Sequence, residues 1–205
     1  MLLSRMRVAA LAGVLLLANP AAGGETFGSR KPLVCPKESK LTILDGPKNK
    51  AEFCTVGKIL HGPAREWYPN GEQRTSDNWS HGKQIGLWIE WDEKGVKRQE
   101  HCYREGKLDG RETIWYANGQ RQSITHYSNG QKDGPIAQWS EDGLQLASGQ
   151  FLKDKAEGKW TFRDPDTRET WYVMYVHGEA VEKTHIRDDE FNPWVESPAR
   201  CDGAV

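Results

Sequence analysis

The sequence predicts an all-β protein: an elongated, twisted antiparallel meander of about five stacked 24-residue β-hairpin repeats. Two observations carry this prediction, namely residue columns that recur every 24 positions and turn signals that separate short segments suited to strands. Two of the columns are glycine, one is tryptophan and one is aromatic. The columns are Gly62, Gly86, Gly110, Gly134 and Gly158; Gly71, Gly95, Gly119 and Gly143; Trp67, Trp91, Trp115 and Trp139; and Trp79, Tyr103, Tyr127, Phe151 and Tyr175.

One repeat, residues 110–133, shows how each hairpin is expected to form. Asn118-Gly119 is a strong hairpin signal, because both residues tolerate positive φ. A segment ending near Trp115 precedes this turn, and a segment ending near Tyr127 follows it. A second glycine-containing link then leads to Gly134, so each glycine of the first column is expected to mark the reversal that starts the next hairpin.

The N-terminus has the pattern of a secretory signal peptide. Arg5 and Arg7 precede an apolar run from Val8 to Ala18, and small residues follow. We expect residues 1–23 to be removed by cleavage after Gly23, which places the mature protein in the periplasm of a Gram-negative-type bacterium or outside the cell. An uncleaved N-terminal anchor is the alternative.

Three further segments follow the signal peptide. Residues 24–56 contain several prolines and predict an irregular lead-in, with one short strand from Leu41 to Leu44. Residues 57–181 are the repeat array. The next position of the first glycine column holds Glu182, so the pattern ends there, and residues 182–205 are expected to form a C-terminal capping tail.

Four cysteines form an even set in a chain expected to be exported, which favours disulfide bonds. Three pairings are possible. We favour Cys35–Cys54, which would fasten the N-terminal segment, and Cys102–Cys201, which would tie the tail to the repeats. Free buried thiols are the alternative. The absence of a CxxC motif argues against a zinc knuckle and a thioredoxin-type site.

Several classes of function are disfavoured. The net charge is −1, and loss of Arg5 and Arg7 makes it −1 − 2 = −3, which is not the balance of a nucleic-acid binder. The six histidines form no HExxH or HxxxH pair, and no GxSxG or GxxxxGK[ST] motif is present. We therefore expect no catalytic residue, no metal and no cofactor.

The repeat units resemble MORN repeats, above all the bacterial variant class with a G-x-W-x-x-W start, an N/D-G turn and a Y-x-x-G-K-x-x-G close. Residues 86–110 and 110–134 show the pattern best, and the resemblance covers roughly residues 57–178. The first tryptophan position is kept by Trp88 and Trp160. The departures from the pattern are Ala64, Glu112, Ile136, Asp154, Arg163 and Thr167. The resemblance implies a non-catalytic array that binds proteins or associates with membranes, often in antitoxins or immunity partners of secreted toxins.

The leading hypothesis is protein–protein recognition by the broad face of the sheet, with neutralisation of a toxin as one form of it. Binding to envelope glycan or lipid through aromatic residues is the alternative. The regular tryptophan column is best explained by packing, whereas tryptophans outside the columns are better candidates for contact. The partner-binding candidates are Arg65, Trp88, Glu90, Arg98, His101, Arg121, His126, Trp160 and Trp171.

Overall fold

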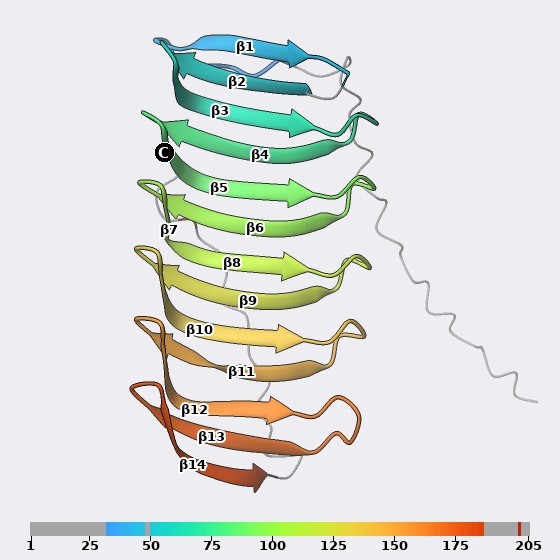
Figure 1. The fold of residues 1–205 in the computed structure, drawn as a ribbon, viewed down its shortest axis with the longest axis vertical. Coiled ribbons are helices and arrows are strands. Elements are labelled where there is room, and N and C mark those ends of the chain that lie inside the picture. The colour runs from blue at the N-terminus through green and yellow to red at the C-terminus, as the bar shows by residue number, and fades with distance from the viewer. Residues whose placement is uncertain (1–31, 48–49, 187–200, 202–205) are drawn as a thin grey trace, which may run out of the picture.

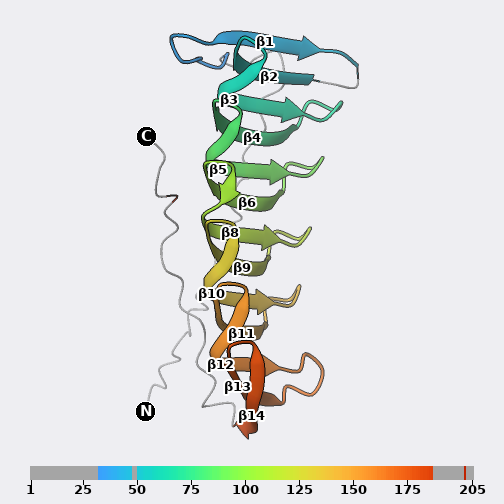
Figure 2. The same cartoon turned by 60° about the vertical axis from the view of Figure 1, so that its left-hand side comes forward.

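The computed structural model describes residues 32–47, 50–186 and 201. These residues form one 14-stranded antiparallel sheet in which strands follow one another in chain order; the two-residue β7 pairs only with β6. The strands stack into an elongated array with β1 and β14 as its edges (Figures 1 and 2). The strands are β1 (Lys40–Asp45), β2 (Lys50–Val56), β3 (Ile59–Trp67), β4 (Gln73–Ser80), β5 (Lys83–Trp91), β6 (Lys97–Arg104), β7 (Lys107–Leu108), β8 (Gly110–Trp115), β9 (Arg121–Ser128), β10 (Gln131–Trp139), β11 (Gln145–Leu152), β12 (Lys155–Arg163), β13 (Thr170–Val176) and β14 (Glu179–Ile186).

The Asn-Gly turns lie where the sequence predicts them. In the turn between β3 and β4, the amide of Gly71 donates to Tyr68 O at 2.9 Å, and the amide of Tyr68 donates to Glu72 O at 2.9 Å. The same pair of bonds recurs at Gly95, Gly119 and Gly143. Gly71 has φ 95°, a conformation that costs glycine little.

The other end of each hairpin reverses at a different pair of residues. His81 and Gly82 both have positive φ, as a two-residue hairpin loop of this kind requires. The amide of Gly82 donates to Leu60 O, 22 residues earlier in the chain, at 2.9 Å. Equivalent bonds join Gly106 to Gln84, Gly130 to Leu108, Asp154 to Lys132 and Gly178 to Ala156. Each turn is thus fastened to the preceding repeat.

The glycines of the first column do not mark reversals, and this part of the prediction is wrong. Gly62 is the fourth residue of β3, and Gly86 and Gly134 hold the same place in β5 and β10. Their φ values are positive, and the strand pairing shifts register opposite them, for example between Lys132 and Ile136. They are β-bulge positions, which bend a strand without ending it.

The two ends of the array differ from the sequence prediction. The strand predicted from Leu41 to Leu44 lies within β1, but the expected lead-in also contains β2, and the two strands pair from Lys40↔Thr55 to Asp45↔Lys50. At the other end, β14 continues to Ile186, beyond the expected boundary at 182. The proposed signal peptide lies outside the described residues.

The tryptophan column packs along the edge formed by the Asn-Gly turns. Trp67 is only 3% exposed. The side-chain amine of Lys97, which is paired with Trp91 across the strands, lies 5.1 Å from the ring centre of Trp115. The Tyr68 hydroxyl donates to Trp91 O at 2.9 Å, which links consecutive repeats. This arrangement agrees with the packing role expected of the column.

Both predicted disulfides are confirmed. Cys35–Cys54 joins residues 19 apart, and Cys102–Cys201 joins residues 99 apart. All four cysteines are therefore used. Two disulfides suggest an oxidising, extracytoplasmic environment.

Candidate functional site: the aromatic face

The strand register divides the side chains between two faces of the sheet. Partners across antiparallel strands share a face, and neighbours along a strand alternate between faces. We call one the aromatic face, because it carries the aromatic column and three further tryptophans. Its members are Trp79, Trp88, Tyr103, Tyr127, Phe151, Trp160, Phe162, Trp171 and Tyr175. We call the other the opposite face; it carries Cys102 and Glu100.

A central row crosses the aromatic face from β2 to β13. Most steps of the row are cross-strand pairs. Three steps lie one residue beyond a pair, namely Asp77–Trp88 beside Ser76↔Ile89, His101–Glu112 beside Glu100↔Thr113, and Gly149–Trp160 beside Ser148↔Thr161. The row is Phe53, Ala64, Asp77, Trp88, His101, Glu112, Thr125, Ile136, Gly149, Trp160 and Val173. Ala64, Glu112 and Ile136, which depart from the first tryptophan position of the motif, all belong to it. The irregular side chains therefore form one continuous line across regular strands.

The N-terminal half of this row is polar and acidic. His101 Nδ1 lies 3.0 Å from Glu112 Oε1, and both side chains are largely buried. The Trp88 ring is tilted against His101 with ring centres 4.9 Å apart. Burial raises the pKa of the Asp77 carboxyl to about 6, with Glu66 adding to the rise. This half thus combines carboxyl groups with aromatic rings.

Tyrosines border the same cluster. The Tyr127 hydroxyl donates to Glu112 Oε2 at 3.4 Å. Burial, and then the charge of Glu112, raise the pKa of Tyr127 to about 12. Burial also raises the pKa of Tyr103, with Glu112 and Asp77 contributing. Both phenols therefore stay protonated at neutral pH and can donate hydrogen bonds.

The C-terminal half of the aromatic face is mainly apolar, and the ammonium of Lys132 lies over its Phe151 ring at 5.2 Å. Trp160 packs edge-on against Phe151 at 5.0 Å and donates from Nε1 to Gln150 O at 3.1 Å. Phe162 stacks on Trp171 with ring centres 6.0 Å apart. Gly149 makes room for this cluster, since a Cβ there would lie 2.2 Å from the Trp160 ring.

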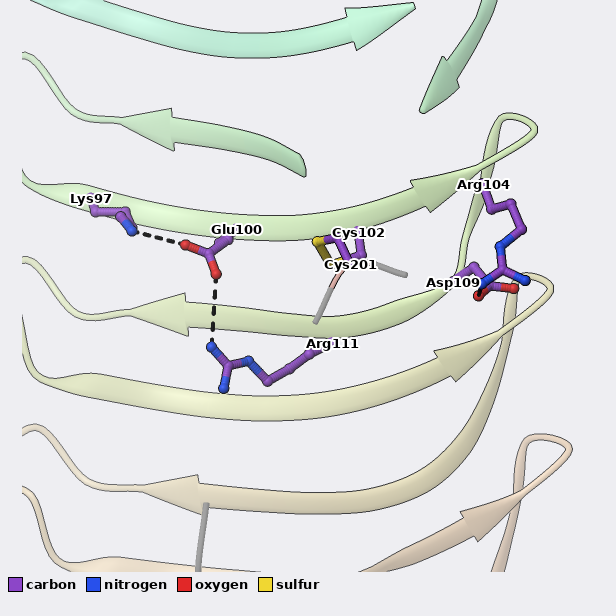
Figure 3. The surroundings of a disulfide bond; sticks show 7 residues. All are labelled: Lys97, Glu100, Cys102, Arg104, Asp109, Arg111 and Cys201. Atoms are coloured by element: carbon purple, nitrogen blue, oxygen red, sulfur yellow. Dashed lines mark hydrogen bonds and ion pairs between the residues drawn. A yellow bond between two sulfur atoms is a disulfide. The ribbon is translucent and has the colours of Figure 1, made fainter. Parts of the chain in front are cut away.

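The opposite face pairs its charges internally, as Figure 3 shows around the Cys102–Cys201 bond. Lys97 Nζ lies 2.8 Å from Glu100 Oε2, and Arg111 lies 3.8 Å from Glu100 Oε1. Arg104 contacts Asp109 at 3.1 Å. The carboxylate of Glu100 therefore has cationic partners within the chain.

The structure separates the predicted contact residues between the two faces and the edges. The aromatic face holds Trp88, Glu90, His101, Trp160 and Trp171. Arg65 and His126 lie on the opposite face, where their cross-strand partners are Glu52 and Arg111. Arg98 lies beside Asp92 at a bulge, and the Arg121 guanidinium lies over the Trp139 ring.

Two candidates are more buried than expected. Trp160 is 8% exposed and His101 is 9% exposed. The expectation that Trp160 is an exposed contact is wrong, because Gly149 lets its ring sink into the aromatic cluster. Sequence reasoning also missed Asp77 as a site residue, although an acidic side chain inside an alternating strand is a usable signal.

A hollow of ≈ 520 Å³ lies between residues 34–36 and strands β3 to β5, with Ile85 and Leu87 in its wall. Residues 32–47, 50–186 and 201 hold no group of three or more His, Cys, Asp or Glu placed to bind a metal. Over the same residues, no helix has the length and apolar character needed to span a bilayer.

Comparison with known proteins identifies the class of repeat. The family model described as "MORN repeat variant" matches residues 108–129, which form the end of β7, β8, the Asn-Gly turn and β9. The matched segment is thus similar to a MORN repeat variant, and the same turn and column residues recur in the neighbouring hairpins. MORN repeats are generally non-catalytic modules that bind proteins or lipids.

More distant comparisons add little. Among curated proteins, none matches the chain. One similar solved structure is a chain of the GtfA/B complex bound to UDP and GlcNAc, with 17% identity over 68% of this chain and 26% of that chain, at a TM-score of 0.27. This protein thus spans about a quarter of that chain's length, and a likeness this weak carries no functional argument.

Proposed function

We propose that this is an exported, non-catalytic repeat protein that binds a protein partner through its aromatic face. One observation carries the proposal: the first tryptophan position of the motif, which varies between repeats as Ala64, Trp88, Glu112, Ile136 and Trp160, lies in the central row, while the regular columns build the frame. Two disulfides support an extracytoplasmic location. Half-buried aromatic residues such as Trp88 and Trp171 suit a protein interface.

A toxin is the partner class that we propose first. This finer proposal rests on the resemblance to bacterial MORN variants in antitoxin and immunity proteins. The corresponding location is the periplasm or the outside of the cell, after cleavage following Gly23. Mass spectrometry of the exported protein tests the location: a mass beginning at Gly24 with no alkylatable thiol is expected. A mass beginning at Met1 with four alkylatable thiols contradicts it.

Site-specific photo-cross-linking tests the binding face. A photoreactive phenylalanine analogue is placed at Trp171 on the aromatic face or at the adjacent Tyr172 on the opposite face. Both side chains are half-buried, so the two variants are matched in position and exposure. We expect a discrete polypeptide adduct from position 171 and none from position 172.

Other outcomes decide against the proposal. Adducts from position 172 alone would move the interface to the opposite face. If no polypeptide is captured but the protein sediments with purified peptidoglycan, and Trp88→Ala weakens sedimentation, envelope glycan is the ligand. Flotation with liposomes under the same conditions would instead indicate lipid.

A further inference from the structure

The two halves of the aromatic face differ in charge, and this difference restricts the charge distribution of a complementary partner. From β3 to β8 the face carries Glu66, Asp77, Glu90 and Glu112. The basic side chains among these carboxyl groups are His101 and, beside Glu66, Arg74. From β10 to β13 the face is mainly apolar, with members such as Ile136, Phe151 and Trp160. The charged side chain in this part of the described register is Lys132, which is paired with Tyr127 and whose ammonium lies 5.2 Å from the centre of the Phe151 ring. A complementary partner is basic at one end and apolar at the other.

The acidic groups of this half are unequally neutralised. Glu112 is engaged by His101 and by the Tyr127 hydroxyl. Glu66 lies 4.0 Å from Arg74. Asp77 is hydrogen-bonded to the side chains of Trp79 and Gln84. Within the part of the chain that the structure describes, neither Asp77 nor Glu90 has a cationic side chain in contact, in contrast to Glu100 on the opposite face. The nearby Arg98 is already paired with Asp92 at 3.5 Å.

Asp77 and Glu90 flank one aromatic ring. Trp88 lies two residues before Glu90, on the same side of β5, and Asp77 lies on the adjacent strand β4. Cross-strand neighbours have Cβ atoms about 5 Å apart, and i, i+2 neighbours about 7 Å apart. A planar cation over Trp88 would therefore reach both carboxyl groups. Guanidinium suits this arrangement, since it stacks on indole and binds carboxylate through two N–H groups.

We propose that Asp77, Trp88 and Glu90 form the binding site for an arginine side chain of the protein partner, whose following apolar residues lie along β10 to β13. This inference rests on the proposed function and states the chemistry of its partner. The raised pKa of Asp77 agrees with it, because a buried carboxylate without a cation is held partly protonated and gains most when a cation arrives.

Titration of the disulfide-intact full chain with a small probe tests the site directly. The probe is N-acetyl-L-arginine amide, and the readout is the indole N–H signal of Trp88, assigned with Trp88→Phe. We expect a saturable millimolar shift with the arginine amide and none with N-acetyl-L-citrulline amide, which is neutral and similar in shape. The double variant Asp77→Asn/Glu90→Gln should weaken binding about tenfold.

A matched control is Glu93→Gln, an exposed carboxylate in the turn after β5, which should bind as the wild type does. Equal shifts with citrulline amide, no shift at Trp88, or unchanged affinity in the double variant would each overturn the site. Shifts confined to residues around Glu100 would overturn it as well.

Cross-linking from position 171 separates this inference from the proposed function. Loss of the adduct in Asp77→Asn/Glu90→Gln, together with competition by arginine amide, supports both. If the Asp77→Asn/Glu90→Gln variant gives the adduct in undiminished yield, the proposal of protein binding stands and the arginine site is overturned. Absence of an adduct in the otherwise wild-type chain overturns the proposed function and the partner chemistry that rests on it.

Discussion

At the scale of single residues, Gly149 decides how the aromatic face packs. Its φ is not in the left-handed region, so its role is steric rather than conformational, and an added Cβ would meet the Trp160 ring at 2.2 Å. We expect Gly149→Ala to destabilise the protein by about 1–3 kcal/mol. Urea denaturation with disulfides intact measures this value.

A double-mutant cycle gives the control. In a Trp160→Val background the obstructing ring is gone, so Gly149→Ala should then cost clearly less. If Gly149→Ala lowers the free energy of unfolding equally in the wild-type and Trp160→Val backgrounds, the effect of the mutation does not come from a clash with the Trp160 ring.

Asp77 gives a pH dependence with a defined sign. Its pKa rises from an ordinary 3.8 to about 6 on folding, so the folded protein binds more protons between these values. Stability contributed by the protonated carboxyl is therefore lost as pH rises from about 4 through 6. Because solvent still reaches the group, the loss should be about 1–2 kcal/mol.

Asp77→Asn should remove this loss and make the protein more stable than wild type at pH 7. Urea midpoints of the two proteins at pH 4.5 and pH 7 measure it. If the difference in stability between the wild type and Asp77→Asn is the same at pH 4.5 and pH 7, the raised pKa of Asp77 is contradicted.

At the scale of the elements, the two kinds of glycine have different tasks. Gly134 sits inside β10 with φ 116°, and an added Cβ would approach His126 Cβ at 3.1 Å. Gly119 sits in a turn with φ 84° and open space around it. We expect Gly134→Ala to lower stability by about 2–3 kcal/mol and Gly119→Ala by about 1 kcal/mol. Thermal melting of both variants decides; a larger effect at Gly119 would be inconsistent with the bulge role.

Much of the frame follows from local signals. Asn-Gly turns and the 24-residue interval predict the meander, because turn chemistry depends on adjacent residues. The same interval does not distinguish a chain reversal from a β-bulge, since glycine occurs at both. For this reason the sequence analysis assigns Gly62 and its column to reversals, whereas they lie at bulges inside strands. Strands β1 and β2 lack the repeat pattern, and their pairing is a tertiary effect.

The candidate site was less predictable than the frame. Glu112 and Ile136 were recognised only as departures from a motif, because their shared row appears once the strand register is fixed. The division of contact candidates between two faces depends on the same register. Burial of Trp160 depends on a glycine one strand away, which a single sequence does not connect to it.

At the scale of the whole molecule, the two disulfides restrain very different lengths of chain. Loop-closure entropy predicts about 3 kcal/mol for the 19-residue separation of Cys35–Cys54 and about 5 kcal/mol for the 99-residue separation of Cys102–Cys201. Cys102→Ser/Cys201→Ser should therefore destabilise the protein more than Cys35→Ser/Cys54→Ser. Denaturation midpoints of the two double variants test the order, and the reverse order would contradict it.

These crosslinks also divide the chain topologically. One covalent ring encloses residues 35–54 and the other encloses residues 102–201, so residues 55–101 belong to neither. That stretch contains Asp77, Trp88 and Glu90. Its hairpins can be lengthened, removed or exchanged in whole 24-residue units without changing the circumference of either ring. The part of the array proposed to recognise a partner is therefore the part in which the number and identity of repeats are freest to diverge.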